Sequence, residues 1–157
     1  MIRPMSQASR VVTVGSEWSR LPEWREQMSE HPNVSVINRM TEAAVAGDTE
    51  ALAACFTEDM VFHVRGPLPG AGDHRGVGGF LGVIGTIFEL TSGDVKLDQL
   101  FVIANDDWAA EWEHAVFGRD GRTLDTHNAF IYRFEDGRIA ELWMLGAGPA
   151  GSESFFA

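Results

Sequence analysis

The chain has a single cysteine, few basic residues and no long hydrophobic run. Its one cysteine, Cys55, cannot form a disulfide within the 157 residues. Lys and Arg number 12 against 23 Asp and Glu, and the resulting net charge of −11 argues against nucleic acid or anionic membrane as a partner. No apolar stretch is long enough to span a membrane, and the N-terminus has no continuous apolar core of a signal peptide. A cytoplasmic protein is therefore expected.

Hydrophobic spacing divides the chain into an N-terminal extension, a helical part and a strand-rich part. Residues 1–33 are expected to form a partly disordered extension with a short helix that carries Trp18 and Trp24. A Gly- and Pro-rich loop over 66–79 is typical of segments that frame a pocket mouth. Helices are predicted over 34–46, over 48–56 and from Val77 or Phe80 to Leu90, and strands over 60–65 and 97–104.

The stretch from Trp108 to Leu145 is predicted to form three antiparallel strands joined by two tight turns. Both turns contain Asp-Gly, at Asp120-Gly121 and at Asp136-Gly137. Glycine accepts the positive φ that short hairpin turns require, so this pair is a strong hairpin signal. Helices that precede a run of antiparallel strands indicate an α+β fold. The strands are predicted over 108–118, 123–134 and 138–145.

The length of the first turn decides which residues share a face, because a shift of one residue turns a strand over. With a three-residue loop, His114 pairs with Thr126 and joins Asn128 on one face. With a two-residue loop, Glu113 joins Asn128 instead. We adopt the three-residue loops. They place Ala110, Trp112, His114, Val116, Leu124, Thr126, Asn128, Phe130, Tyr132, Leu142 and Met144 on an inner face, and Glu111, Glu113, His127, Ala129, Ile131, Arg133, Ile139, Glu141 and Trp143 on an outer face.

Four polar side chains on this inner face are the candidate catalytic groups, together with one on the first strand. His114 is the preferred general base because imidazole exchanges protons near neutral pH. Asn128 and Tyr132 would stabilise negative charge on a substrate oxygen, with Thr126 beside them. His63 is a further candidate at the pocket rim. A polar cluster that only satisfies its own hydrogen bonds is the equal alternative.

The apolar residues near these groups are expected to line a pocket for a small hydrophobic molecule, with an ordinary filled core as the alternative. The histidines lack the close spacing of metal ligands, and the glycines lack the spacing of a dinucleotide-binding loop, so no metal and no cofactor is expected. The predicted lining is Met40, Phe62, Val64, Phe80, Ile84, Phe88, Trp112, Thr126, Phe130, Leu142 and Met144.

Four short segments give residues 34–157 a family resemblance. They are Ala46-Gly47-Asp48, the run over 56–64, Asp73-His74-Arg75-Gly76 and the run over 132–139. Together they resemble the SnoaL-like branch of the nuclear transport factor 2-like superfamily, which includes polyketide cyclases, ketosteroid isomerases, epoxide hydrolases and non-catalytic proteins. The resemblance implies an α+β domain over 34–157, in which three helices pack on the concave face of a curved antiparallel sheet. The expected shape is a cone or barrel with one apolar pocket.

The resemblance also places family carboxylates at positions that are apolar in this chain. Ketosteroid isomerases have their base where this chain has Val64, and their oxyanion donors where it has Met40 and Phe130. SnoaL-like cyclases have an Asp at the position of Phe130, and limonene epoxide hydrolases a carboxylate near Met144. Steroid-isomerase and epoxide-hydrolase mechanisms are therefore disfavoured.

The expected function is a cofactor-independent isomerase, cyclase or dehydratase. Its substrate would be a hydrophobic oxygenated molecule, polyketide- or terpenoid-like, and its chemistry general acid/base catalysis. The alternative is a non-catalytic module for ligand binding or assembly. A homodimer is expected through the outer sheet face around Ile131, Ile139 and Trp143.

Overall fold

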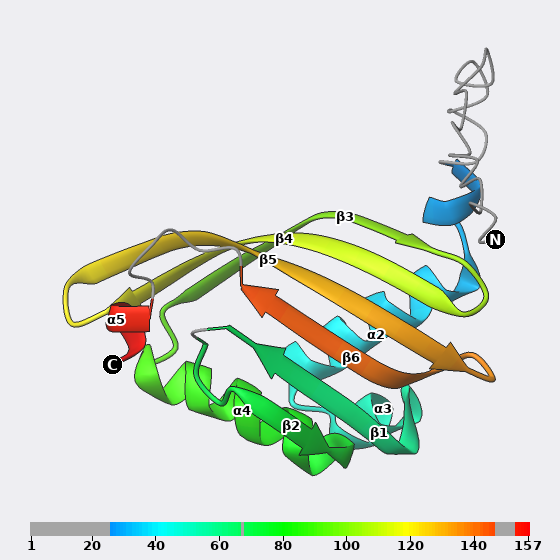
Figure 1. Ribbon diagram of the computed structural model, residues 1–157, viewed down its shortest axis with the longest axis horizontal. Coiled ribbons are helices and arrows are strands. Elements are labelled where there is room, and N and C mark those ends of the chain that lie inside the picture. Colours follow the sequence, from blue (N-terminus) through cyan, green and yellow to red (C-terminus); the bar gives the residue numbers. More distant parts are fainter. Residues whose placement is uncertain (1–25, 67, 147–152) are drawn as a thin grey trace, which may run out of the picture.

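The computed structural model describes residues 26–66, 68–146 and 153–157 and has an α+β fold (Figure 1). A curved, open six-stranded sheet has the order β2-β1-β6-β5-β4-β3, with helices against one face. The predicted fold class is confirmed, although β1 and β6 pair in parallel within the otherwise antiparallel sheet. The elements are α2 (Pro32–Ala46), α3 (Thr49–Ala54), β1 (Phe56–Arg65), β2 (Gly72–Arg75), α4 (Gly76–Leu90), β3 (Val95–Ala104), β4 (Trp108–Arg119), β5 (Arg122–Glu135), β6 (Arg138–Gly146) and α5 (Glu153–Phe156).

The helix boundaries follow from capping residues that the sequence reveals. Pro32 occupies the first turn of α2, where its missing N–H is not needed. Gly47 ends α2 in the left-handed conformation, with φ of 69°. The carboxylate of Asp48 accepts a hydrogen bond from the backbone N–H of Ala51 at 3.0 Å and so begins α3. The two predicted helices therefore lie where expected, to within about two residues.

The predicted loop over 66–79 is partly wrong. It contains the four-residue strand β2, whose residues pair antiparallel with Val61–Val64 of β1, and α4 begins at Gly76. A strand this short, set among glycines, carries no detectable alternation in the sequence. Trp18 and Trp24 lie outside the described residues, and the division of the chain after residue 33 stays a prediction.

Both hairpin turns have two-residue loops. Asp120 and Gly121 have φ of 53° and 74°, and Asp136 and Gly137 have φ of 49° and 72°. Two successive residues with positive φ are the mark of a type I′ turn, which matches the twist of the strands that it joins. Arg119 therefore pairs with Arg122.

This turn geometry overturns the predicted face of β4. Glu113 pairs with Asn128, so Glu111 and Glu113 lie on the inner face. Trp112 and His114 were predicted there and lie on the outer face instead. The inner residues of β4 are Ala109, Glu111, Glu113, Ala115 and Phe117, whereas Ala110, Trp112, His114 and Val116 alternate with them.

The faces predicted for β5 and β6 are confirmed except at Ile139. Phe130 pairs with Met144 rather than with Leu142, which shifts the register by two residues and keeps the same faces. A register shift after Arg133 turns Ile139 inward, where its side chain is 0% exposed. Ile139 is therefore a core residue and is excluded from the predicted dimer face.

The C-terminal helix α5 closes one end of the inner face, beneath the β4–β5 turn (Figure 1). Phe155 is buried in the core, and the ring of Phe156 packs edge-on against Phe117 at 5.5 Å. The Arg119 guanidinium donates to the carbonyl oxygens of Phe155 and Ala157 at 3.0 and 3.1 Å. Arg122 also donates to the Phe155 carbonyl and stacks over the Phe155 ring.

Replacing Phe155 with alanine is expected to lower the free energy of unfolding by about 3 kcal/mol, because it removes a buried ring and leaves a cavity. Urea denaturation measures this change. Val45→Ala on the exposed side of α2 is the control and should change it by less than about 0.5 kcal/mol. Equal effects of the two substitutions would show that α5 does not pack on the domain in solution.

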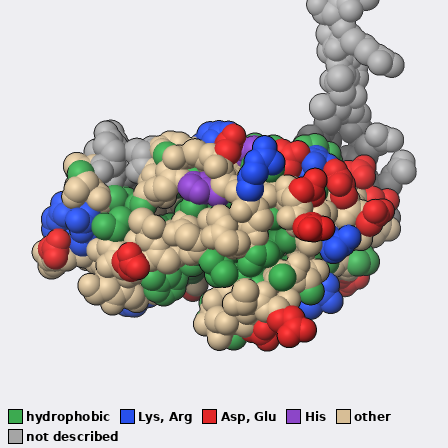
Figure 2. Space-filling view, turned by 90° about the horizontal axis from the view of Figure 1, so that it is seen from below, with side chains coloured by type: hydrophobic (Ala, Val, Ile, Leu, Met, Phe, Trp, Pro, Cys, Tyr) green, Lys and Arg blue, Asp and Glu red, His purple; other side chains and the backbone are tan. Residues whose placement is uncertain are grey.

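The surface reflects the acidic composition. In Figure 2 acidic side chains gather toward the right-hand end, where the β3–β4 and β5–β6 turns lie in Figure 1. Asp106, Asp107, Glu135 and Asp136 are exposed in these two turns. No helix within the described part of the chain is long and apolar enough to cross a membrane.

Candidate functional site

Five polar side chains lie buried on the inner face of β4 and β5, which is otherwise apolar. Because side chains alternate along a strand, each strand brings every second residue to this face. Beside them, Gln99 extends from the edge strand β3, opposite Glu113. The buried residues are Glu111, Glu113, Thr126, Asn128 and Tyr132.

Glu113 and Asn128 form the central pair of the site. They lie directly opposite each other on adjacent strands, and the Asn128 Nδ2 donates to Glu113 Oε1 at 3.0 Å. Burial raises the pKa of the Glu113 carboxyl to about 7. The bond from Asn128 opposes this rise, and the nearby charge of Glu111 adds to it. A carboxyl with this pKa can both accept and release a proton at neutral pH.

Glu111 is held more firmly by two donors. The Tyr132 hydroxyl donates to Glu111 Oε2 at 2.5 Å, and Gln99 Nε2 donates to Glu111 Oε1 at 3.0 Å. Burial raises the pKa of Glu111, while these two hydrogen bonds oppose the rise. Burial and the charge of Glu111 raise the pKa of Tyr132 well above its ordinary value, so the phenol keeps its proton. Glu111 and Tyr132 therefore form a fixed polar support beside Glu113.

Hydrogen bonds between the described residues engage both oxygens of Glu111 and one oxygen of Glu113. Glu113 is thus the carboxyl with a free position for a reacting proton. The inner face also reaches solvent along the edge strand β3, where Leu97 lies opposite Ala115 and is 48% exposed.

His114, the predicted general base, lies outside this site. Its Nε2 is 2.9 Å from Asp125 Oδ1 on the outer face, and the hydrogen bond to Asp125 raises its pKa. Trp112, predicted to line the pocket, stacks on His127 on the same outer face, with ring centroids 5.2 Å apart. The two-residue turn is the physical reason for both corrections.

His63 also lies on the outer face. Its Nδ1 is 2.9 Å from Asp73 Oδ1 and its Nε2 is 3.1 Å from Glu141 Oε2. The ring stacks on Trp143 at 4.8 Å between centroids. His63 therefore joins β2, β1 and β6 through side-chain hydrogen bonds and does not face the Glu113 site.

The predicted apolar lining is mostly on the inner side. Trp112 on the outer face and Phe88, whose side chain is exposed on α4, are the exceptions, and Ile84 and Phe130 are only partly buried. The buried members are Met40, Phe62, Val64, Phe80, Leu142 and Met144. No group of three or more metal-binding side chains occurs within residues 26–66, 68–146 and 153–157.

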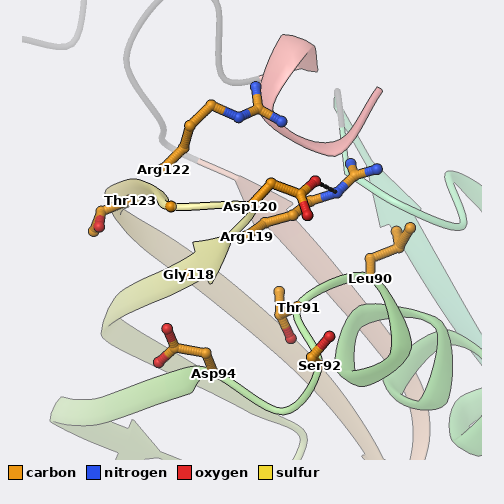
Figure 3. A pocket seen from close by; sticks show the side chains of 10 residues that line it. Leu90, Thr91, Ser92, Asp94, Gly118, Arg119, Asp120, Arg122 and Thr123 are labelled. Atoms are coloured by element: carbon orange, nitrogen blue, oxygen red, sulfur yellow. Dashed lines mark ion pairs between the residues drawn. The ribbon is translucent and has the colours of Figure 1, made fainter.

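Surface hollows occur away from this site. One, of about 360 Å³, lies between the end of α4 and the β4–β5 turn (Figure 3). Its two arginines, Arg119 and Arg122, are engaged in holding α5. Another, of about 490 Å³, lies between α2 and α3 and includes Arg39 and Cys55. Burial raises the pKa of the Cys55 thiol, which makes it a poor nucleophile.

The sequence prediction identified Asn128, Tyr132 and Thr126 but not Glu111 or Gln99, and it gave Glu113 only as the partner of Asn128 in the alternative register. The signal that was available is the Asp-Gly pair itself, because Asp tolerates positive φ and two such residues favour a type I′ turn. Trp112 and Val116 made the opposite face of β4 look more suitable for burial than the two glutamates.

Comparisons with known proteins agree with this architecture. An uncharacterized protein of Mycobacterium tuberculosis is 28% identical over 131 residues, which is 83% of this chain and all of that protein. The structure of Bal32a, from a soil-derived mobile gene cassette, superposes with a TM-score of 0.71 at 24% identity, over 80% of this chain and 97% of that one. IdmH of Streptomyces antibioticus superposes with a TM-score of 0.60 at 23% identity, over 74% and 92%.

A family model described as the SnoaL-like domain matches residues 37–142, which is more than half of the chain. This range runs from α2 to β6 and includes every residue of the Glu113 site. The chain therefore belongs to the SnoaL-like domain family.

Proposed function

We propose that this protein catalyses a cofactor-independent proton transfer, as an isomerase, cyclase or dehydratase of a hydrophobic oxygenated molecule. The observation that carries the proposal is the buried Glu113 carboxyl, whose pKa of about 7 suits both acid and base catalysis. Glu113 replaces His114 as the proton carrier. The hydrogen bond from Asn128 orients the Glu113 carboxyl, and the hydrogen bond from Tyr132 to Glu111 joins β5 to β4 beside it.

The apolar surroundings support a hydrophobic substrate. Phe130, Leu142 and Met144 lie on the same face of the sheet as Asn128 and would pack against carbon atoms of the ligand. Structural relatives include TerC, which was co-crystallised with polyporic acid, and IdmH, a candidate polyketide cyclase. The compound bound to TerC and the description of IdmH both support an apolar substrate with oxygen substituents, such as a polyketide.

The proposal is tested by proton exchange in an enolisable apolar ketone. We expect the protein to exchange the α-hydrogens of 2-tetralone for deuterium in D₂O, measured by nuclear magnetic resonance. The rate should rise as pH increases through about 7, because Glu113 must be ionised to remove a proton. Binding of apolar ketones without exchange of any of them would favour the non-catalytic alternative.

We also propose that the outer sheet face joins two copies of the chain. Trp108, Trp112 and Trp143 lie on this face, and Trp108 is 45% exposed while stacking on Trp143 at 6.0 Å. Aromatic residues in such positions are enriched at protein interfaces.

Trp143→Asp is expected to convert the dimer to a monomer, because it replaces one of the stacked aromatic rings of this face with a charge. Light scattering after size exclusion would measure the change toward the 17.2 kDa chain mass. Val45→Asp, on the exposed side of α2, is the matched control and should leave the mass unchanged. A wild-type chain that is already monomeric would refute the proposed dimer.

A further inference from the structure

The side chain of Asn128 has an acceptor that receives no hydrogen bond from residues 26–66, 68–146 and 153–157. Its side chain is 1% exposed, and its Nδ2 is committed to Glu113. Its Oδ1 is buried and receives no hydrogen bond from the described residues. A buried acceptor with no donor costs free energy, because folding has removed the water that would have bonded to it.

The described neighbours of Asn128 do not supply a donor to Oδ1. On the β6 side its partner is Gly146, and a Cβ at that position would meet the Leu68 side chain at 3.2 Å. Leu68 therefore covers the place where a polar side chain could stand. The Thr126 hydroxyl is directed to the His127 carbonyl at 3.5 Å. Phe130 follows Asn128 on the same face and is apolar.

The acceptor thus lies beside the Glu113 carboxyl, which has one oxygen engaged by Asn128, and its other described neighbours, Phe130 and Leu68, are apolar. A group that satisfied it would have to bring an O–H or N–H hydrogen while fitting against hydrocarbon. A molecule with an ether or unsubstituted carbonyl oxygen at this point would bring a second acceptor and leave Oδ1 unpaired.

We propose that the ligand of this site presents a hydroxyl hydrogen to Asn128 Oδ1. The substrate class is then apolar molecules that carry a phenol, an enol or an alcohol at the reacting end, and not their ethers. This inference rests on the proposed function of the Glu113 site, because it concerns the ligand on which Glu113 acts. Asn128 has two roles here, since it positions Glu113 through Nδ2 and recognises the ligand through Oδ1.

A matched pair of ligands tests the proposal. Isothermal titration calorimetry of the full chain with 2-naphthol and with 2-methoxynaphthalene compares a hydroxyl with its methyl ether on the same ring system. We expect 2-naphthol to bind about tenfold more tightly, the effect of one buried hydrogen bond. In Asn128→Leu this ratio should fall to about threefold or less, whereas His114→Ala, on the outer face beside Asp125, should keep it.

Equal affinity of the two ligands for the wild-type chain would overturn the proposal, and so would a lack of binding by both. A tenfold ratio that persists in Asn128→Leu would assign the recognition to Glu113 instead. If Asn128→Leu fails to fold, the wild-type comparison still decides. This binding measurement does not depend on turnover. If the chain prefers 2-naphthol but does not exchange the hydrogens of 2-tetralone, the proposed catalysis is wrong and this inference stands. If it exchanges those hydrogens but does not prefer 2-naphthol, this inference is wrong and the proposed catalysis stands.

Discussion

Glu113→Gln is expected to reduce the rate of proton exchange by about 10²- to 10⁴-fold, the range that a positioned general base contributes. Glutamine has almost the same shape and can accept the Asn128 hydrogen bond, but it cannot take up a proton at neutral pH. Ligand affinity should therefore change by only a few fold. Exchange kinetics and calorimetry on the same protein separate these two effects.

His114→Ala is the matched control for this substitution. His114 lies on the outer face beside Asp125, so its replacement should leave the exchange rate close to that of the wild type.

Tyr132→Phe tests the support of Glu111 and not the proton transfer itself. It removes the donor to Glu111 and should disturb the site through the position of that carboxyl. A loss of activity in His114→Ala as large as that in Glu113→Gln would contradict the assignment.

The wild-type chain is expected to lose stability relative to Glu113→Gln as pH rises from about 4 to 8. The pKa of Glu113 is about 7 in the folded chain and lies near 4.5 when the carboxyl is free in water. The folded state therefore binds the proton more tightly than the unfolded state does. The stabilising effect of the protonated Glu113 is complete below the pKa that this carboxyl has in the unfolded chain. It is lost as the pH rises through the pKa that the carboxyl has in the folded chain.

The expected change in the stability difference between the two proteins is about 3 kcal/mol, since one pKa unit corresponds to about 1.4 kcal/mol. Urea denaturation of both proteins at several pH values measures it. Comparing the two proteins at each pH cancels the titration of carboxyls elsewhere in the chain. Glu58→Gln, which removes an exposed carboxyl from β1, controls for the loss of one negative charge. A difference that stays constant with pH would mean that Glu113 is not buried as an acid in solution.

The burial that raises the pKa of a carboxyl also favours its neutral form, and this is how the chain keeps two glutamates on its inner face. A charged carboxylate is costly to bury, whereas a neutral one that is hydrogen-bonded costs much less. Glu111 is compensated by Tyr132 and Gln99, and Glu113 by Asn128. The stability lost at high pH is therefore linked directly to the group that performs the proposed chemistry.

The sequence determined the elements of this protein well. Periodicity predicted α2, α4 and the strands other than β2, and Gly47 and Asp48 marked the junction of α2 and α3 because each has a specific capping role. The two Asp-Gly pairs located both hairpins. Local conformational preferences decide these features, so a single sequence contains them.

The tertiary structure alone decided which face of β4 is buried. Asp-Gly is compatible with a two- or a three-residue loop, and the choice exchanges His114 for Glu113 beside Asn128. Hydrophobicity favoured the wrong face, because Trp112 and Val116 compete with two glutamates. The glutamates can be buried only because Tyr132, Gln99 and Asn128, from two other strands, meet them there. That compensation is a property of three strands packed side by side, which no local pattern in one strand reveals.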